Sequence, residues 1–141
     1  MSEYDQLYIS PKTHTIRTDP AGRWRPGMKI HPVIYNRTKN RFQFAPVLEC
    51  TAVQKIEIKD ASHLSMNDPS LTYTVSVPIK TRDWEETFHL AYQVFIEDRL
   101  LNGEEATQLA LNDGFPSIEA FFLWFNKDFK GKIIHWTDLR Y

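Results

Sequence analysis

The sequence predicts an α+β domain in which a small curled sheet or barrel of antiparallel strands is capped by helices. Three observations support this class. Several stretches alternate apolar and polar residues with a period of two, which is typical of strands buried on one face. Two stretches with helical spacing follow them, and a short apolar stretch closes the chain. Strands first and helices afterwards exclude a doubly wound parallel fold.

The strands are predicted from turns and alternation. Residues 25–28 (RPGM) read as a type II turn, with proline and glycine at its two central positions, and a strand over 28–35 should follow. Pro32 within it indicates an edge strand or a bulge. Alternating apolar residues predict further strands over 48–58, 73–79 and 88–96.

The helices are predicted from their caps. Asn102 with Glu105 three residues later resembles a capping box, for a helix that ends near residue 111. Ser117 should cap a second helix, whose helically spaced apolar side chains are expected in the core: Ile118, Phe121, Phe122 and Phe125. Residues 132–136 should form the last strand.

Length and composition fit one domain covering residues 1–141. With 42% hydrophobic and 25% charged residues the chain is globular rather than disordered or fibrous. A single cysteine, Cys50, cannot form an internal disulfide, which favours a reducing compartment. The longest apolar run, 120–125, is too short to cross a bilayer, and the start lacks the features of a signal peptide. We therefore expect a cytoplasmic protein without membrane association.

The near-neutral net charge conceals a division of the chain. Residues 1–59 carry ten Lys and Arg against five Asp and Glu, whereas residues 60–141 carry seven against thirteen. The cations are densest over 12–41, where Trp24, Tyr35 and His14 lie among them. Such a mixture is what a polyanion with stacking bases would select. The alternative is that these cations point into solvent on unrelated faces.

Common metal and phosphate motifs are missing from the sequence. The histidines, at 14, 31, 63, 89 and 135, show no spacing typical of metal ligands, and one cysteine cannot build a zinc cage. No glycine-rich phosphate loop and no Gly-x-Ser-x-Gly elbow occurs. We therefore expect no metal site and no cofactor.

Residues 12–17 (KTHTIR) gather functional side chains in a short segment. Ser10 and Pro11 resemble the start of a helical turn, which would place the Lys12 ammonium and the Thr15 hydroxyl on one side. A lysine that loses its proton there can act as base for a threonine nucleophile, as in Ser-Lys catalysis. A carboxylate from elsewhere would have to complete such a site. The alternative is an ordinary surface loop.

Five segments in order resemble the ASCH domain family of the PUA-like superfamily, in particular its small stand-alone bacterial and phage-type members. They are residues 12–17 (KTHTIR), 24–30 (WRPGMKI), 54–58 (QKIEI), 109–115 (LALNDGF) and 131–136 (GKIIHW). Together they span nearly the whole chain. The resemblance implies a PUA-like small mixed β-barrel with helices flanking a cleft.

The resemblance also implies a link to RNA. The expected function is a basic cleft that binds RNA, a nucleotide or a nucleoside. Lys12 and Arg17 would meet a phosphate or a base edge, Arg23 and Lys29 would extend the track for the backbone, and Trp24 would stack. The ligand's identity and the oligomeric state stay open.

Two enzymatic alternatives follow from the same resemblance. One branch of the family hydrolyses acylated cytidines with a lysine, a threonine and a glutamate. By position these become Lys12 as base, Thr15 as nucleophile and Asp113, an aspartate in place of the glutamate, as acid partner. The other alternative is a ribonuclease in which His14 or His135 moves protons.

A purely structural role is the remaining alternative. Lys12 or Arg17 would then pair with Asp113 or Glu119 and tie the N-terminal segment to the helices.

Overall fold

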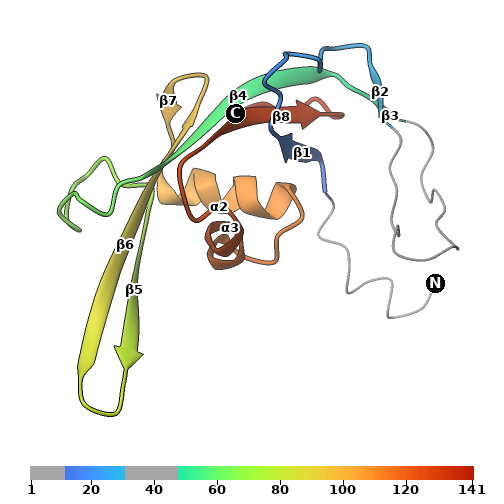
Figure 1. Ribbon diagram of the computed structural model, residues 1–141. Helices are drawn as coiled ribbons and strands as arrows, with labels where there is room; N and C mark the ends of the chain where they lie inside the picture. Colours follow the sequence, from blue (N-terminus) through green and yellow to red (C-terminus); the bar gives the residue numbers. More distant parts are fainter. Residues whose placement is uncertain (1–11, 31–47) are drawn as a thin grey trace, which may run out of the picture.

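The computed structural model describes residues 12–30 and 48–141, and all structural statements below concern these residues. The fold is α+β, an antiparallel half-barrel sheet with two short helices against its concave side (Figure 1). Its elements in chain order are β1 His14–Arg17, β2 Lys29–Ile30, β3 Leu48–Glu49, β4 Ala52–Asp60, β5 Tyr73–Lys80, β6 Glu85–Ile96, β7 Arg99–Leu100, α2 Gly103–Asn112, α3 Ile118–Trp124 and β8 Phe129–His135.

The main sheet has the strand order β1-β8-β4-β6-β5, and β7 adds a short pairing to β6. All pairings are antiparallel. The last strand, β8, therefore lies between β1 and β4, and it brings the two ends of the described chain side by side. β1 and β5 are the outer strands of this order, so the described sheet is curled but not closed.

The core lies between the concave face of the sheet and the helices. Alternation in β4 and β6 buries Ile56 and Ile58 together with Tyr92, Val94 and Ile96, as the period of two predicts. Helix α3 inserts Phe122, whose ring stacks on that of Tyr92 with centroids 4.9 Å apart. The predicted apolar stripe of α3 is thus confirmed as core, with Phe121 fully buried.

Both predicted helix starts are confirmed. Asn102 accepts from the Glu105 backbone N–H while the Glu105 side chain accepts from the Asn102 N–H, a complete capping box. The Ser117 side chain accepts from the Ala120 N–H at the start of α3. The helices begin where local side chains satisfy their first backbone donors.

Two predicted turns lie near the N-terminus, one after Pro11 and one over residues 25–28. The helical turn expected after Pro11 is wrong, because Lys12 and Thr13 have no regular structure and β1 begins at His14. Pairing with β8 satisfies this backbone instead. The type II turn is confirmed: Met28 N–H donates to the Arg25 carbonyl at 3.3 Å and Gly27 has φ 93°. The strand that follows is described only as Lys29–Ile30, and the rest of the expected strand and the turn over 36–40 lie outside the described residues.

The strand expected over 48–58 is divided into β3 and β4 by a change of partner. Cys50 N–H donates to the Met28 carbonyl, whereas Thr51 N–H donates to the carbonyl of His135. The chain passes from the small β2-β3 sheet to the main sheet between these two residues. Alternation continues across the break and therefore did not reveal it.

The far end of the β5-β6 hairpin extends beyond the helices (Figure 1). Val77, Ile79 and Phe88 keep the predicted alternation, but they are exposed because no helix covers them. Alternation thus predicted the strands correctly but not the burial of this end.

Candidate ligand-binding site

A cavity of about 250 Å³ opens at the edge of the sheet, between β1 and the helices. We call it the edge cavity. It is lined by Lys12, Thr15, Ile16, Arg17, Asp113, Gly114, Phe115, Trp124 and Phe125. Residues about one hundred positions apart in the sequence therefore share one wall. β1 supplies this wall because it is an outer strand of the sheet.

Backbone contacts fix the N-terminal side of the edge cavity against the end of α2. Thr13 N–H donates to the Asn112 carbonyl at 2.8 Å, and the Lys12 ammonium donates to the Asp113 carbonyl at 3.2 Å. Gly114 follows the helix with φ 92°, where a side chain would be strained. The Lys12 stem lies over it, 3.6 Å from the position a Cβ would take. The end of α2 thus holds the Lys12 ammonium at the wall of the edge cavity.

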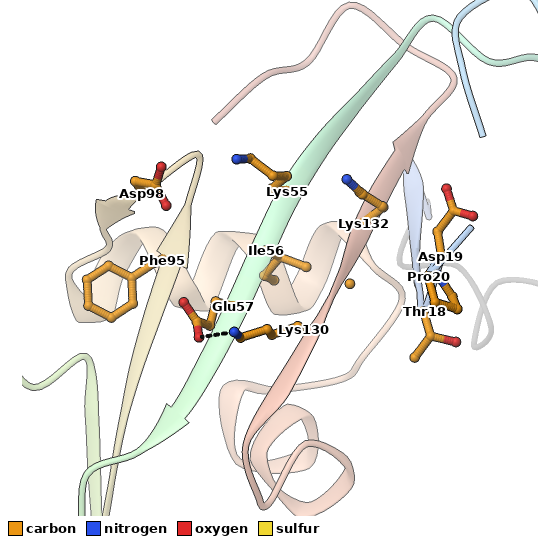
Figure 2. Close-up of a pocket in the computed structure, with 11 residues that line it drawn as sticks. Thr18, Asp19, Pro20, Lys55, Ile56, Glu57, Phe95, Asp98, Lys130 and Lys132 are labelled. Atoms are coloured by element: carbon orange, nitrogen blue, oxygen red, sulfur yellow. Dashed lines mark ion pairs between the residues drawn. The ribbon is translucent and has the colours of Figure 1, made fainter. Parts of the chain in front are cut away.

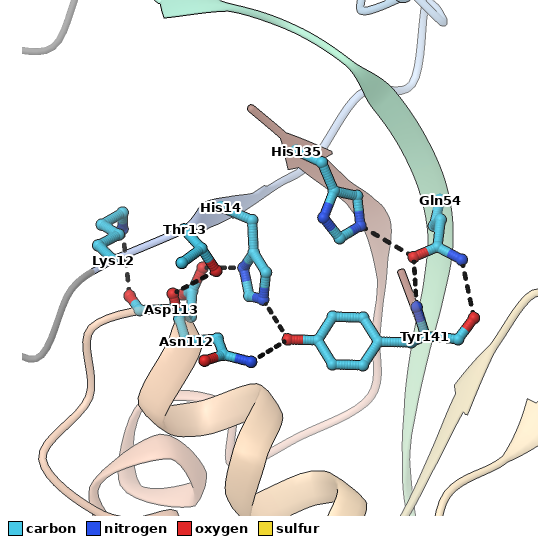
Figure 3. Close-up of polar contacts among 8 residues, drawn as sticks. All are labelled: Lys12, Thr13, His14, Gln54, Asn112, Asp113, His135 and Tyr141. Carbon is cyan, nitrogen blue, oxygen red and sulfur yellow. Dashed lines mark hydrogen bonds and ion pairs between the residues drawn. The ribbon is translucent and has the colours of Figure 1, made fainter. Parts of the chain in front are cut away.

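The Asp113 carboxylate is hydrogen-bonded to a chain of buried polar groups (Figure 3). His14 is fully buried, and its Nδ1 lies 3.0 Å from Asp113 Oδ1. His14 Nε2 lies 2.6 Å from the Tyr141 hydroxyl, which also accepts from Asn112 Nδ2 at 3.0 Å. Because an ionised carboxylate only accepts, we assign the proton to Nδ1, and the Tyr141 hydroxyl then donates to Nε2. All four groups are satisfied in this way.

His135 lies next to this chain and is also fully buried. Its Nε2 donates to Gln54 Oε1 at 2.8 Å, and Tyr141 N–H donates to the same oxygen at 3.1 Å. Burial, with smaller effects from His14 and Arg140, lowers the pKa of His135 to about 4. Burial likewise raises the pKa of the Tyr141 hydroxyl to about 12. Both side chains are therefore neutral at pH 7, and His135 bonds to Gln54 as an uncharged ring.

The edge cavity combines cationic and aromatic groups at a half-open site. Lys12 and Arg17 are exposed, while the Asp113 residue is only 8% exposed and bonded to His14. Trp124 is 74% exposed although it is a large apolar side chain. Two exposed cations and an exposed indole suit an anionic ligand with a planar ring.

The structure brings together some of the predicted site residues and separates others. Lys12, Thr15 and Asp113, the three expected catalytic residues, all line the edge cavity together with Arg17. Strand alternation puts the Thr15 side chain on the opposite face of the sheet from buried His14 and Ile16. Thr15 lines the edge cavity, but its side chain lies on the other face of the sheet from His14, which bonds to Asp113.

The remaining predicted binding residues lie elsewhere. His14 and His135 are fully buried and belong to the polar chain rather than to the cavity surface. Arg23, Trp24 and Lys29 do not line the edge cavity. The Asp19 carboxylate accepts from the backbone N–H groups of Arg23 and Trp24 and so organises a separate loop.

The sequence analysis missed two residues of this region. Trp124 lines the cavity from α3, and the only signal for it was a large aromatic residue off the apolar stripe of that helix. Tyr141 supports His14 from the end of the sequence and had no signal, because its role depends on a contact across 127 positions.

Neither a metal centre nor a spanning helix is found in residues 12–30 and 48–141. No three His, Cys, Asp or Glu side chains are close enough there to hold a metal ion. No helix of this part is long and apolar enough to cross a membrane.

Comparisons with models of protein families, with curated proteins and with solved structures give no match for this chain.

Proposed function

We propose that the edge cavity binds a nucleotide or nucleoside, either free or as part of RNA. The observation that supports this is the meeting of Lys12, Arg17, Asp113 and Trp124 in one cavity. It brings the first and fourth of the five ASCH-like segments, 12–17 and 109–115, to one place. A PUA-like domain with a cleft beside its helices is the finer fold we infer from that resemblance.

The chemistry of the lining assigns a part to each group. Lys12 and Arg17 would contact a phosphate, for which the guanidinium offers a bidentate fork. The exposed Trp124 indole would stack on the base. The volume of about 250 Å³ is slightly below the usual range for small-molecule sites, so one nucleoside rather than a longer segment would enter it.

The test is a binding series with nucleosides, their 5′-monophosphates and a short single-stranded RNA, measured by calorimetry. Lys12→Ala should abolish measurable binding, because it removes the only ammonium that the described residues bring to the edge cavity. Lys127→Ala is the matched control, since it removes the same charge from an exposed position outside the cavity. Binding should also weaken as salt increases. Equal binding by both variants would contradict the proposal.

A second candidate is hydrolysis of an acylated cytidine, favoured by the presence of Lys12, Thr15 and Asp113 in the same cavity. The Thr15 hydroxyl would attack the acyl carbonyl while Lys12 takes its proton, and Lys12 would then give that proton to the leaving nucleoside amine, with the Asp113 carboxylate as its partner. Water would then release the acyl group from Thr15.

The assay for this candidate follows N-acetylcytidine to cytidine and acetate by chromatography. Thr15→Ala and Lys12→Met should each abolish turnover while both proteins remain folded. Full activity in either variant, or no turnover by the wild type, would leave only the binding function.

A further inference from the structure

A second and larger cavity, of about 710 Å³, lies on the convex face of the sheet, away from the helices (Figure 2). We call it the outer cavity. Three lysines line it, Lys55 on β4 and Lys130 and Lys132 on β8, beside the apolar groups of Pro20 and Phe95. Its volume lies within the usual range for small-molecule sites.

The pairing of the strands places cations directly beside one another. Lys132 on β8 is in register with Arg17 on β1 and with Lys55 on β4. Residues in register on neighbouring antiparallel strands point to the same face, with Cβ atoms roughly 5 Å apart. The neighbouring row, Ile16 and Ile133, points into the core. Three positively charged residues thus occupy one row across three strands, of which Lys55 and Lys132 line the outer cavity and Arg17 lines the edge cavity.

This row lacks the carboxylate partners that usually neutralise such charges. Lys130, one row further along, pairs with Glu57 at 3.7 Å. In contrast, none of Arg17, Lys55 and Lys132 makes an ion pair with any other described residue. Like charges directly opposite each other destabilise a sheet. The row therefore costs stability and leaves three donor groups free.

The nearby carboxylates compensate this row only in part. Asp19 lines the outer cavity, its two oxygens accept from the Arg23 and Trp24 backbone N–H groups, and attraction to Lys132 is one of the smaller causes that lower its pKa. Asp98 is on the turn before β7 with φ 65° and forms no ion pair within the described chain. In Figure 2 Asp19 and Asp98 lie on opposite sides, with Lys55 and Lys132 between them. The centre of the outer cavity is thus positive and its two flanks are negative.

We propose that the outer cavity binds the phosphate groups of a ligand, with Lys55 and Lys132 as donors. Two adjacent ammonium groups match two adjacent phosphates, and the ligand removes the repulsion between the lysines on binding. Pro20 and Phe95 offer apolar contacts to the rest of the ligand. Such phosphates can come from a small polyphosphate or from a single-stranded RNA backbone. The site is separate from the edge cavity, which neither Lys55 nor Lys132 lines.

Calorimetry with two probes, sodium tripolyphosphate and a single-stranded oligouridylate of about twelve nucleotides, tests this proposal. The variant is Lys55→Gln/Lys132→Gln, and the matched control is Lys80→Gln/Lys127→Gln, which removes two lysines that do not line the outer cavity. The proposal expects at least one probe to bind the wild type and the control, and to bind the variant at least tenfold more weakly. Tripolyphosphate alone would identify a small polyphosphate, whereas RNA binding would identify the strand backbone.

Two further readouts make the result specific. If RNA binds, the slope of log K against log salt should become less steep by about 1.4 in the variant, because each lost contact removes roughly 0.7. Without ligand, the variant should unfold at a higher temperature than the wild type at low salt, and this difference should vanish at high salt. Lys12→Ala should leave outer-cavity binding intact, which separates this proposal from that for the edge cavity. Absence of binding by both probes, or equal losses in variant and control, would overturn it.

Discussion

Lowering the pH should reduce the folding stability of this protein, because His135 is buried as a neutral ring. Protonation would place a second proton on Nδ1, because Nε2 already donates to Gln54. Nδ1 is buried and has no hydrogen-bond partner among the described residues, so the new N–H would have no acceptor. His14 lies in edge-to-face contact with the same ring, with 5.3 Å between the centroids. The charged form is therefore much less favourable in the folded state than in water.

The size of the effect follows from the two pKa values. The histidine has an ordinary pKa of 6.5, and burial lowers it to about 4 in the folded protein. Above pH 6.5 both states hold the neutral ring, and folding stability does not depend on this group. As the pH falls below that value the unfolded state binds the proton first, so stability declines by up to about 1.4 kcal/mol per pH unit. The total loss reaches about 3 kcal/mol near pH 4 and then stops.

Urea unfolding followed by circular dichroism, from about pH 7 to about pH 4.5, measures this loss, and His135→Gln should remove most of the slope in that range. His63→Gln is the matched control, because His63 is exposed, and it should keep the wild-type slope. A His135→Gln protein with the same pH dependence as the wild type would refute the reasoning. So would a wild type whose stability is constant over this range.

Three further variants test the fold around the edge cavity and the sheet by thermal and urea unfolding. Asp113→Ala removes the acceptor of fully buried His14 and should lower the free energy of unfolding by about 3 kcal/mol, or the Tm by roughly 10 °C. Asp113→Asn keeps an acceptor and should lower the free energy of unfolding by about 1 kcal/mol. Equal losses of stability in the two variants would contradict the assigned hydrogen bond. Gly131→Ala should cost about 1–3 kcal/mol, because the new Cβ would lie 2.5 Å from the Arg17 carbonyl oxygen in the neighbouring strand; an unchanged protein would show that β1 can shift freely. Asn102→Ala removes the cap of α2 and should cost about 1 kcal/mol, and a neutral result would count against the capping box.

The sequence by itself determined the features that depend on neighbours a few positions away. The capping box of Asn102, the cap of Ser117 and the turn at Gly27 were all predicted correctly. Each of these features depends on hydrogen bonds between residues three positions apart, so the local sequence is sufficient to predict it. Alternation likewise predicted β5 and β6, because a strand half-buried against a core needs that period whatever its partner is.

Residues 12–17 show where local reasoning fails. The residues after Pro11 allow a helical turn, but pairing with β8 makes them coil and strand instead. A local preference of this kind is weak compared with a full set of cross-strand hydrogen bonds. Lys12, Thr15 and Asp113, which the resemblance implies as one catalytic set, all line the edge cavity, and their catalytic role stays a prediction.

Only the tertiary structure decided which side chains share a surface. It joined His14 to Asp113 and Tyr141, and it aligned Lys55 with Lys132 across two strands. Strand order and register decide such contacts, and both depend on packing of the whole core rather than on any segment. For the same reason Trp124, and not Trp24, lies at the edge cavity. Sequence composition supplied the charges and the aromatic rings, while the fold determined which of them meet.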